Sequence, residues 1–315
     1  MATPRLGTRG SRLALWQTSS VRAALGRAGH ATEIVTVATT GDRRPTVPLD
    51  RLGLVDAFTD ELDDALLEGR IDLAVHSLKD LPTRLAPGTE IAAIGRRADP
   101  RDALVGRGPL DLDSLPLRGV VATCSVRRRA QLLRLRPDLA VVPLRGNVDG
   151  RVRTLDRRRD WSAILLAVAG LERLALSARI GERIDPDLIM PAPGQGAIAV
   201  TVRAGDHALA RRVRRAFHHG DSALAVAAER AVLDRLDAAC RYPVAALATL
   251  ANGRLRLAAR VVALDASEQL DVRVVGSART LPDAVRLGDR AADRLLDQGA
   301  ARLLATELAE SGARS

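Results

Sequence analysis

The 315 residues are 47% hydrophobic and 27% charged, which is typical of a globular protein long enough for two or three domains. The net charge of +10 is compatible with a nucleic-acid partner, but the 2% aromatic content and arginines that are spread along the chain without a basic tail disfavour one. No apolar run is long enough to cross a bilayer and no signal-peptide core opens the chain, so we expect a cytoplasmic protein without a membrane or nucleic-acid partner.

Short β-rich runs alternate with amphipathic helical stretches through the first two thirds of the chain. The helical stretches include residues 11–29 and 58–69. This alternation predicts α/β domains with parallel or mixed sheets covered by helices, in which ligands gather at the carboxyl ends of strands. The predicted strands are residues 4–8, 32–39, 71–77, 89–95, 119–124, 139–146, 162–170 and 197–203.

Two Pro/Gly-rich breaks, at residues 96–104 and 190–197, interrupt this pattern. If the chain leaves the first α/β domain at one break and returns at the other, the two segments form a double hinge with a ligand cleft between the domains. Two sequential domains without a return crossing are the alternative, and periodicity does not separate the two arrangements.

The last third of the chain has a different pattern. A helix is predicted over residues 222–238 and another from about 281, with strands at 245–250, 255–264 and 270–277 between them. Asn252-Gly253 is a strong hairpin-turn signal. This part is predicted to be a small α+β domain. The predicted domains are residues 1–98 with 197–217, residues 99–196 and residues 218–315.

Lys79, the only lysine in the chain, precedes Asp80 directly after the predicted strand at 71–77. A lysine offers a compact ammonium group where arginine offers a broad fork. An aspartate at a strand end facing a cleft suits hydrogen bonding to a substrate N–H or stabilisation of a developing cation. Taken alone, the pattern slightly favours a surface ion pair beside a turn.

A second polar turn follows the predicted strand at 119–124. Thr123 and Ser125 are good N-cap residues for the helix that begins after them, so the turn is a candidate anion site. Arg127 and Arg128 add guanidinium forks suited to carboxylate or phosphate. Because cations in a first helical turn oppose the helix dipole, structure alone gives little reason for them, which favours a binding role.

A third turn contains Gly146-Asn147 and is flanked by Arg145 and Arg151. Together with Arg9, these arginines fall at predicted strand ends, where they would bind a ligand with several carboxylates or phosphates. A plain connection with solvated arginines is the alternative. The chain has no phosphate-binding glycine loop and no Cys/His set with metal-ligand spacing, so we expect neither nucleotide nor metal.

The two cysteines, Cys124 and Cys240, do not suggest a disulfide scaffold. Cys240 follows a predicted helix end, where the negative end of the dipole disfavours a reactive thiolate. A loop thiol there is still able to react once with a strong electrophile and remain as a thioether. Cys124 is expected to be a small buried apolar residue.

In combination these stretches resemble the porphobilinogen deaminase (hydroxymethylbilane synthase) family. The matching segments, in register over essentially the whole chain, are RLGTRGSRLALWQT, TTGD, HSLKDLP, SVRR, LRGNV, ILLAVAGLERL, PAPGQGA and the late cysteine. The resemblance implies two α/β domains similar to periplasmic binding proteins, joined by a double hinge, and a small α+β domain that carries the cofactor cysteine.

The resemblance also implies the reaction and the site. Four porphobilinogen molecules are joined head to tail with loss of ammonia, giving hydroxymethylbilane on a dipyrromethane cofactor held by a thioether to Cys240. Asp80 matches the catalytic aspartate, which handles pyrrole N–H groups and cationic intermediates. The remaining matched residues bind acidic side chains of cofactor and substrate: Lys79, Thr123, Ser125, Arg127, Arg128 and Arg145 for the cofactor, and Arg9, Ser11, Arg145 and Arg151 for the substrate.

Three departures from the family pattern stand out. Cys124 replaces a serine, Ala238-Ala239 replace paired glycines before Cys240, and residues 45–58 lack the usual glycine- and lysine-rich lid. We expect a monomeric enzyme of tetrapyrrole biosynthesis. The alternatives are a two-lobed binding module, or inactive paralogue, that holds an acidic small molecule without turnover, and a basic RNA-associated protein.

Overall fold

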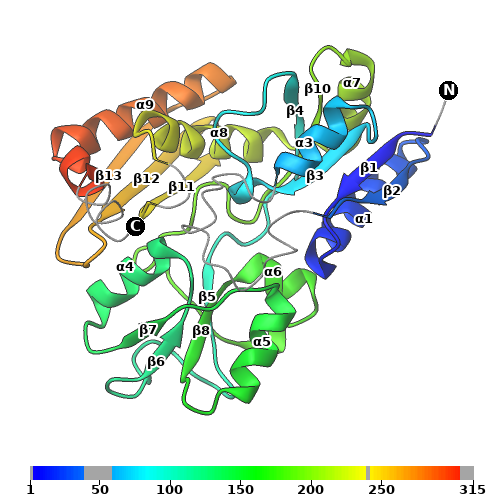
Figure 1. The fold of residues 1–315 in the computed structure, drawn as a ribbon. Helices are drawn as coiled ribbons and strands as arrows, with labels where there is room; N and C mark the ends of the chain where they lie inside the picture. The colour runs from blue at the N-terminus through cyan, green and yellow to red at the C-terminus, as the bar shows by residue number, and fades with distance from the viewer. Residues whose placement is uncertain (1–2, 39–58, 239–241, 306–315) are drawn as a thin grey trace. The chain divides into compact units, whose positions relative to one another are not determined.

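The computed structural model describes residues 3–38, 59–238 and 242–305, and the element labels below are those of Figure 1. The chain divides into two compact units. Unit 1 comprises Met1–Asp99 and Gly196–Ala223, and unit 2 comprises Pro100–Gln195 and Leu224–Ser315. The predicted division into three domains stays a prediction, because unit 2 holds both a second α/β sheet and the C-terminal part.

Unit 1 is built on a five-stranded mixed sheet in the order β2-β1-β3-β10-β4. β1 is parallel to β2 and β3, whereas β10, which comes from the later segment of the unit, is antiparallel to β3 and β4. The strands are β1 Arg5–Thr8, β2 Glu33–Thr36, β3 Leu73–Ser77, β4 Thr89–Ile94 and β10 Ile198–Arg203. The helices are α1 Arg12–Arg27, α3 Asp60–Leu67 and α7 His207–Phe217, with the short 3-10 turn η2 Leu78–Asp80.

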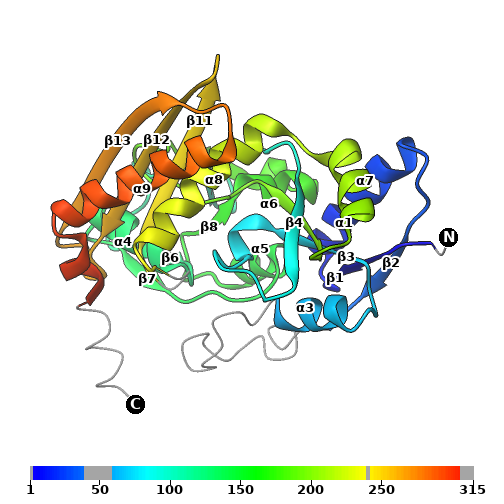
Figure 2. The ribbon, with the colours of Figure 1, turned by 90° about the horizontal axis from the view of Figure 1, so that it is seen from above.

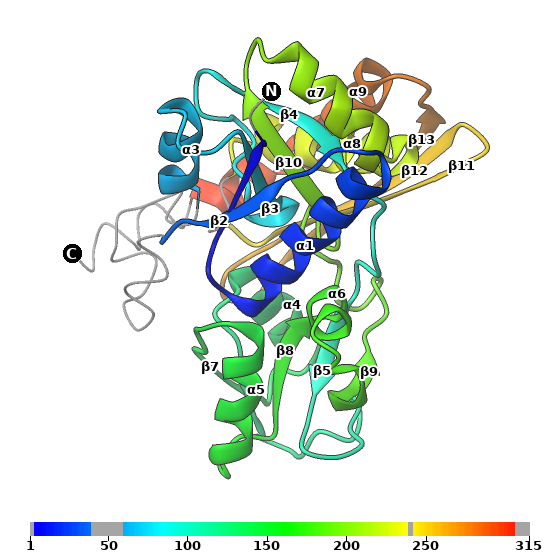
Figure 3. The ribbon, with the colours of Figure 1, turned by 90° about the vertical axis from the view of Figure 1, so that its right-hand side faces the viewer.

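Helices cover both faces of this sheet, as the alternation of strand and helix predicts. Leu73 and Val75 of β3 pack with apolar residues of α1 and α7 in one core cluster, and Figure 3 shows α1 running along the sheet. Ala74, between them in sequence, packs with α3 in a separate cluster. Successive residues of β3 thus face opposite sides of the sheet, and both sides are buried. For this reason Leu73, Ala74 and Val75 form a continuous apolar run and do not alternate with polar residues.

Unit 2 contains a second five-stranded mixed sheet with the order β7-β6-β8-β5-β9. β6 is parallel to β7 and β8, and β5 is antiparallel to β8 and β9, so the strand order and directions repeat those of unit 1. The strands are β5 Asp102–Val105, β6 Val120–Ala122, β7 Ala140–Val142, β8 Ala163–Ala167 and β9 Ile180–Arg183. The helices are α4 Val126–Leu135, α5 Val148–Arg157 and α6 Val168–Arg173, with the 3-10 turn η3 Ser177–Arg179.

The C-terminal part of unit 2 is an antiparallel sheet β11-β12-β13 with two helices on one face (Figure 2). The predicted hairpin turn is confirmed, since Asn252 and Gly253 have φ of 51° and 71° between paired strands. α8 and α9 approach closely, because a Cβ at Gly288 would lie 2.3 Å from the Ala228 carbonyl oxygen. The elements are α8 Gly220–Arg235, β11 Val244–Ala251, β12 Arg254–Val262, β13 Gln269–Ser277 and α9 Leu281–Asp297.

These elements confirm the predicted α/β class, and each predicted strand overlaps an observed one. Two strands were missed. β5 begins at Asp102, inside the predicted break at 96–104. A charged residue was expected to lie outside a strand, but Asp102 is buried here among charged partners. β9 has only four residues and a half-exposed pattern, which carries no clear period of two. Since β10 pairs with β3 and β4, the chain does return to its first sheet.

Candidate functional site

The turn that carries Lys79 and Asp80 is fixed by its buried neighbours. Leu78 is fully buried, and its backbone N–H donates to the Ala197 carbonyl oxygen at 3.0 Å. Ser77, the last residue of β3, is hydrogen-bonded to buried Gln17 of α1, with 2.9 Å between Gln17 Nε2 and Ser77 Oγ. Asp80 itself is exposed, and its carboxylate shows no hydrogen bond or ion pair in the described part of the chain, so a surface ion pair does not account for it.

The β1–α1 turn of unit 1 contains Arg9 and Ser11. Ser11 is the N-cap of α1, and its hydroxyl oxygen accepts from the Ala14 N–H at 3.2 Å. Arg9 is half-buried, and its charge acts on His76, which is buried in β3 next to the Thr201 hydroxyl. Burial, and then the positive charge of Arg9, lower the pKa of His76 to about 4. A neutral His76 therefore lies under the turn at neutral pH.

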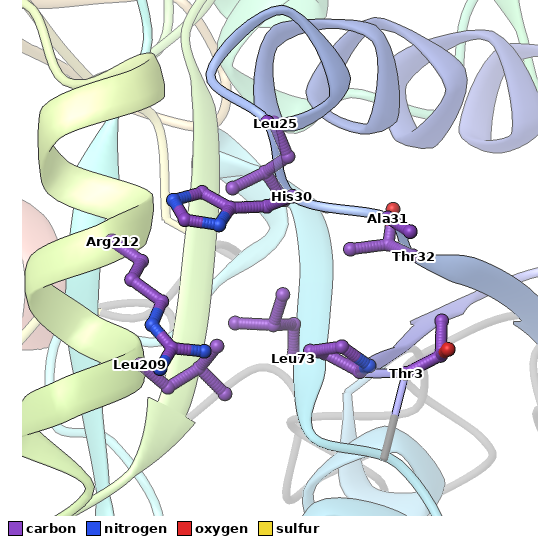
Figure 4. Close-up of a pocket in the computed structure, with 10 residues that line it drawn as sticks. Thr3, Leu25, His30, Ala31, Thr32, Leu73, Leu209 and Arg212 are labelled. Atoms are coloured by element: carbon purple, nitrogen blue, oxygen red, sulfur yellow. The ribbon is translucent and has the colours of Figure 1, made fainter. Parts of the chain in front are cut away.

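A cavity of about 240 Å³ in unit 1 lies at the opposite end of the sheet (Figure 4). It is bordered by Leu25, His30, Leu73, Leu209 and Arg212. Leu73 is the first residue of β3, whereas Lys79 and Asp80 follow its last residue. The cavity is thus separate from the predicted site residues of this unit.

The β6–α4 turn of unit 2 repeats the design of the β1–α1 turn. Ser125 is the N-cap of α4 and accepts from the Arg128 N–H at 3.4 Å, while the hydroxyl oxygen of buried Thr123 accepts from the Ser125 N–H at 3.1 Å. Cys124 between them is exposed, so the expectation of a buried apolar thiol is wrong. The predicted strand at 119–124 included Cys124 as its last residue, but the observed strand ends at Ala122 and the thiol is exposed in the turn.

Arg127 and Arg128 are buried, with only 4% and 5% of each residue exposed. Arg127 Nη1 lies 2.8 Å from Asp102 Oδ2, and Arg128 donates through Nε at 3.0 Å and Nη2 at 2.7 Å to Asp102 Oδ1. The expectation that structure gives little reason for these cations is therefore wrong. A buried carboxylate pairs with both of them and outweighs the opposing helix dipole.

Asp102 was not found by sequence reasoning. It is fully buried at the start of β5, and burial alone would favour its protonated form. The charges of Arg127 and Arg128 outweigh burial and hold the pKa of Asp102 well below its ordinary range. The signal in the sequence was a lone acidic residue heading the apolar run DALV, directly after Pro100-Arg101.

Arg145 lies in the β7–α5 turn, and Arg151 lies in the first turn of α5. Arg151 Nε donates to the Gly146 carbonyl oxygen at 2.6 Å, and Gly146 has a φ of 107°, which a glycine adopts without strain. Arg145 Nη1 is buried and makes no hydrogen bond to any residue in the described ranges. A buried guanidinium N–H without an acceptor is unfavourable, so this atom fits an acidic group supplied by a ligand.

Cys240, the predicted cofactor cysteine, lies outside the described residues, as do Ala239 and the whole lid segment at residues 45–58. In the part of the chain that is described, no group of three His, Cys, Asp or Glu side chains is arranged to hold a metal ion. None of the described helices combines the length and the apolar character needed to span a membrane.

Comparison with protein-family models gives two matches. Residues 5–211 match the porphobilinogen deaminase, dipyromethane cofactor binding domain, and residues 223–297 match the porphobilinogen deaminase C-terminal domain. The porphobilinogen deaminase of Rubrobacter xylanophilus is 46% identical over 300 residues, covering 95% of both chains. That of Moorella thermoacetica is 46% identical over 310 residues, covering 98% of this chain and 97% of its own.

Among solved structures, the methionine binding protein MetQ aligns with 68% of this chain and 89% of its own, at 12% identity and a TM-score of 0.43. A periplasmic substrate-binding protein of an ABC transporter from Coxiella burnetii aligns with 69% of this chain and 92% of its own, at 15% identity and a TM-score of 0.41.

Proposed function

The chain belongs to the porphobilinogen deaminase family, and from this premise we propose which of its residues perform the family reaction. The enzyme condenses four porphobilinogen molecules head to tail, releasing ammonia, into hydroxymethylbilane for tetrapyrrole biosynthesis. The observation that carries this function is the match over nearly the whole chain, to family models at 5–211 and 223–297 and to relatives at 46% identity.

Asp80 is the catalytic residue of this proposal. Its carboxylate is exposed at the end of β3 and is not engaged by other described side chains, so it is available to a substrate. A carboxylate accepts hydrogen bonds from pyrrole N–H groups and stabilises positive charge that develops on them. Ser77, Leu78 and their partners, Gln17 of α1 and Ala197 directly before β10, support the rigid placement of Asp80.

The cations and hydroxyls of the turns bind the carboxylates of cofactor and substrate. We assign Lys79, Thr123, Ser125, Arg127, Arg128 and Arg145 to the cofactor, and Arg9, Ser11, Arg145 and Arg151 to the substrate. Support comes from Arg145, whose buried Nη1 lacks an acceptor. A dipyrromethane carries several carboxylates, and forked guanidinium groups are suited to such anions. When bound, this group supplies the primer on which the pyrrole chain grows.

Cys240 holds the cofactor through a thioether in this proposal. Intact mass spectrometry of the purified protein tests it, because the chain should exceed its sequence mass by two pyrrole units. Cys240→Ser should remove the excess, whereas Cys124→Ser, which changes the only other cysteine, should keep it. An unmodified, folded wild-type protein would instead favour the two-lobed binding module.

We further propose that the enzyme acts as a monomer in the cytoplasm and without nucleic acid. The low aromatic content and the spread of arginines along the chain support the last point. Size-exclusion chromatography with light scattering tests the monomer, and a single species of twice the chain mass would contradict it.

A further inference from the structure

Asp102 joins three separate segments of unit 2 at one buried carboxylate. Its Oδ1 accepts from Arg128 Nε and Nη2 and from Gln195 Nε2, the last at 2.9 Å, and its Oδ2 accepts from Arg127 Nη1. Gln195 Nε2 also donates to the Pro100 carbonyl oxygen at 2.7 Å. Asp102 therefore fixes the planes of two guanidinium groups relative to the start of β5.

The charges of this cluster do not cancel. One carboxylate faces two guanidinium groups, and no other acidic side chain forms an ion pair with Arg127 or Arg128 among the described residues. Within the same ranges, Nε and Nη2 of Arg127 make no hydrogen bond, while its Nη1 donates to both Asp102 and the Met190 carbonyl oxygen. One positive charge and one free donor edge thus remain for an acceptor from outside the protein.

We propose that Asp102 is a positioning residue for the carboxylate-binding arginines. This inference rests on the proposed function, because the ligand carboxylates are those assigned above to Arg127 and Arg128. Asp102 is fully buried, so it does not touch the ligand itself. It neutralises one of the two cations and orients both, so that the remaining positive charge is presented in a fixed direction.

Asp72 in unit 1 offers a matched control for a purely structural ion pair. It also holds two arginines, accepting from Arg5 Nε at 3.1 Å and from Arg203 Nη2 at 3.0 Å. Neither of these arginines has a role in the proposed site. Loss of an aspartate that only ties strands together should affect stability alone.

The test compares Asp102→Asn, Asp72→Asn and wild-type protein. Intact mass gives the fraction of each that carries the two-pyrrole adduct, and steady-state kinetics give kcat and KM. For Asp102→Asn we expect the loaded fraction to fall by about tenfold, because Arg127 and Arg128 are assigned to the cofactor, while KM for porphobilinogen and kcat per loaded enzyme change by less than about twofold. Asp72→Asn should match wild type in all three quantities.

If Asp102→Asn does not fold, Gln195→Met provides a second test of the inference. It removes the hydrogen bonds from Gln195 to Asp102 and to the Pro100 carbonyl oxygen without removing a charge, and should lower the loaded fraction by about twofold to threefold. Equal loading of wild type and of the folded Asp102 or Gln195 variant would overturn the inference alone. A wild-type protein without the adduct would overturn the proposed function and this inference together.

Discussion

The β1–α1 turn of unit 1 and the β6–α4 turn of unit 2 occupy the same place in two sheets of the same strand order. Each has a threonine at the strand end and a serine as the helix N-cap. Beneath the first turn lies His76, buried beside Arg9 with a pKa of about 4. Beneath the second lies Asp102, buried and ionised between Arg127 and Arg128.

This difference shows how one topology supports two electrostatic arrangements. In unit 1 the buried group, His76, is neutral at pH 7 and so adds no positive charge beneath the β1–α1 turn. In unit 2 the buried group, Asp102, is ionised and forms ion pairs with Arg127 and Arg128. The fold provides strand ends and helix N-termini, and the buried titratable residue decides which charge they present.

The largest expected effect is on catalysis. Asp80→Asn should reduce kcat by about 10²- to 10⁴-fold, because the amide removes the negative charge and turns one acceptor into a donor. Thermal unfolding should be nearly unchanged, since Asp80 is exposed and makes no described hydrogen bond. Asp113→Asn, at another exposed aspartate, is the control and should keep full turnover. Near-normal hydroxymethylbilane production by Asp80→Asn would refute the role of Asp80.

The second effect is on the stability of unit 2. Asp102→Asn should reduce the free energy of unfolding by about 3–5 kcal/mol, because two buried guanidinium groups lose their counter-charge. Asp72→Asn should cost less, about 1–2 kcal/mol, because the Asp72 side chain is 19% exposed and water replaces part of its role. Urea unfolding at pH 7 measures both. Equal losses would show that burial of the ion pair is not the deciding factor.

The third effect is the pH dependence that His76 contributes to unit 1. The pKa of His76 falls from an ordinary 6.5 to about 4 on folding, so its stabilising contribution is complete above pH 6.5 and is lost as pH falls toward 4. Between pH 7 and pH 4.5, wild type should lose about 2–3 kcal/mol more than His76→Gln. Urea unfolding of both proteins at the two pH values tests this. Identical pH dependences would contradict it.

The smallest effects belong to the shared N-caps. Ser11→Ala and Ser125→Ala should each cost about 1 kcal/mol of stability, because each removes the acceptor for one N–H of the first helical turn. Ser20→Ala, inside α1, is the control and should be neutral or slightly stabilising, since alanine is the better helix former there. A loss of stability in only one of the two Ser→Ala variants would show that the two turns are not equivalent.

The sequence by itself determined most elements and the turns that hold the candidate residues. Short apolar runs such as IDLAVHS, and the Asn252-Gly253 signal, predict local structure because the pattern and the backbone preference act within a few residues. Lys79-Asp80 and the Thr123–Arg128 turn were placed at strand ends for the same reason. The family resemblance then supplied roles that periodicity could not.

Only the tertiary structure decided which charged groups are buried and with what. Asp102 and Arg128 are 26 positions apart and Gln195 is 93 positions from Asp102, so no local pattern indicates that they meet at one carboxylate. The same holds for the exposure of Cys124, for the neutral state of His76 and for the unsatisfied Nη1 of Arg145. Ionisation and hydrogen bonding depend on the whole surrounding volume, and that volume is assembled from distant segments.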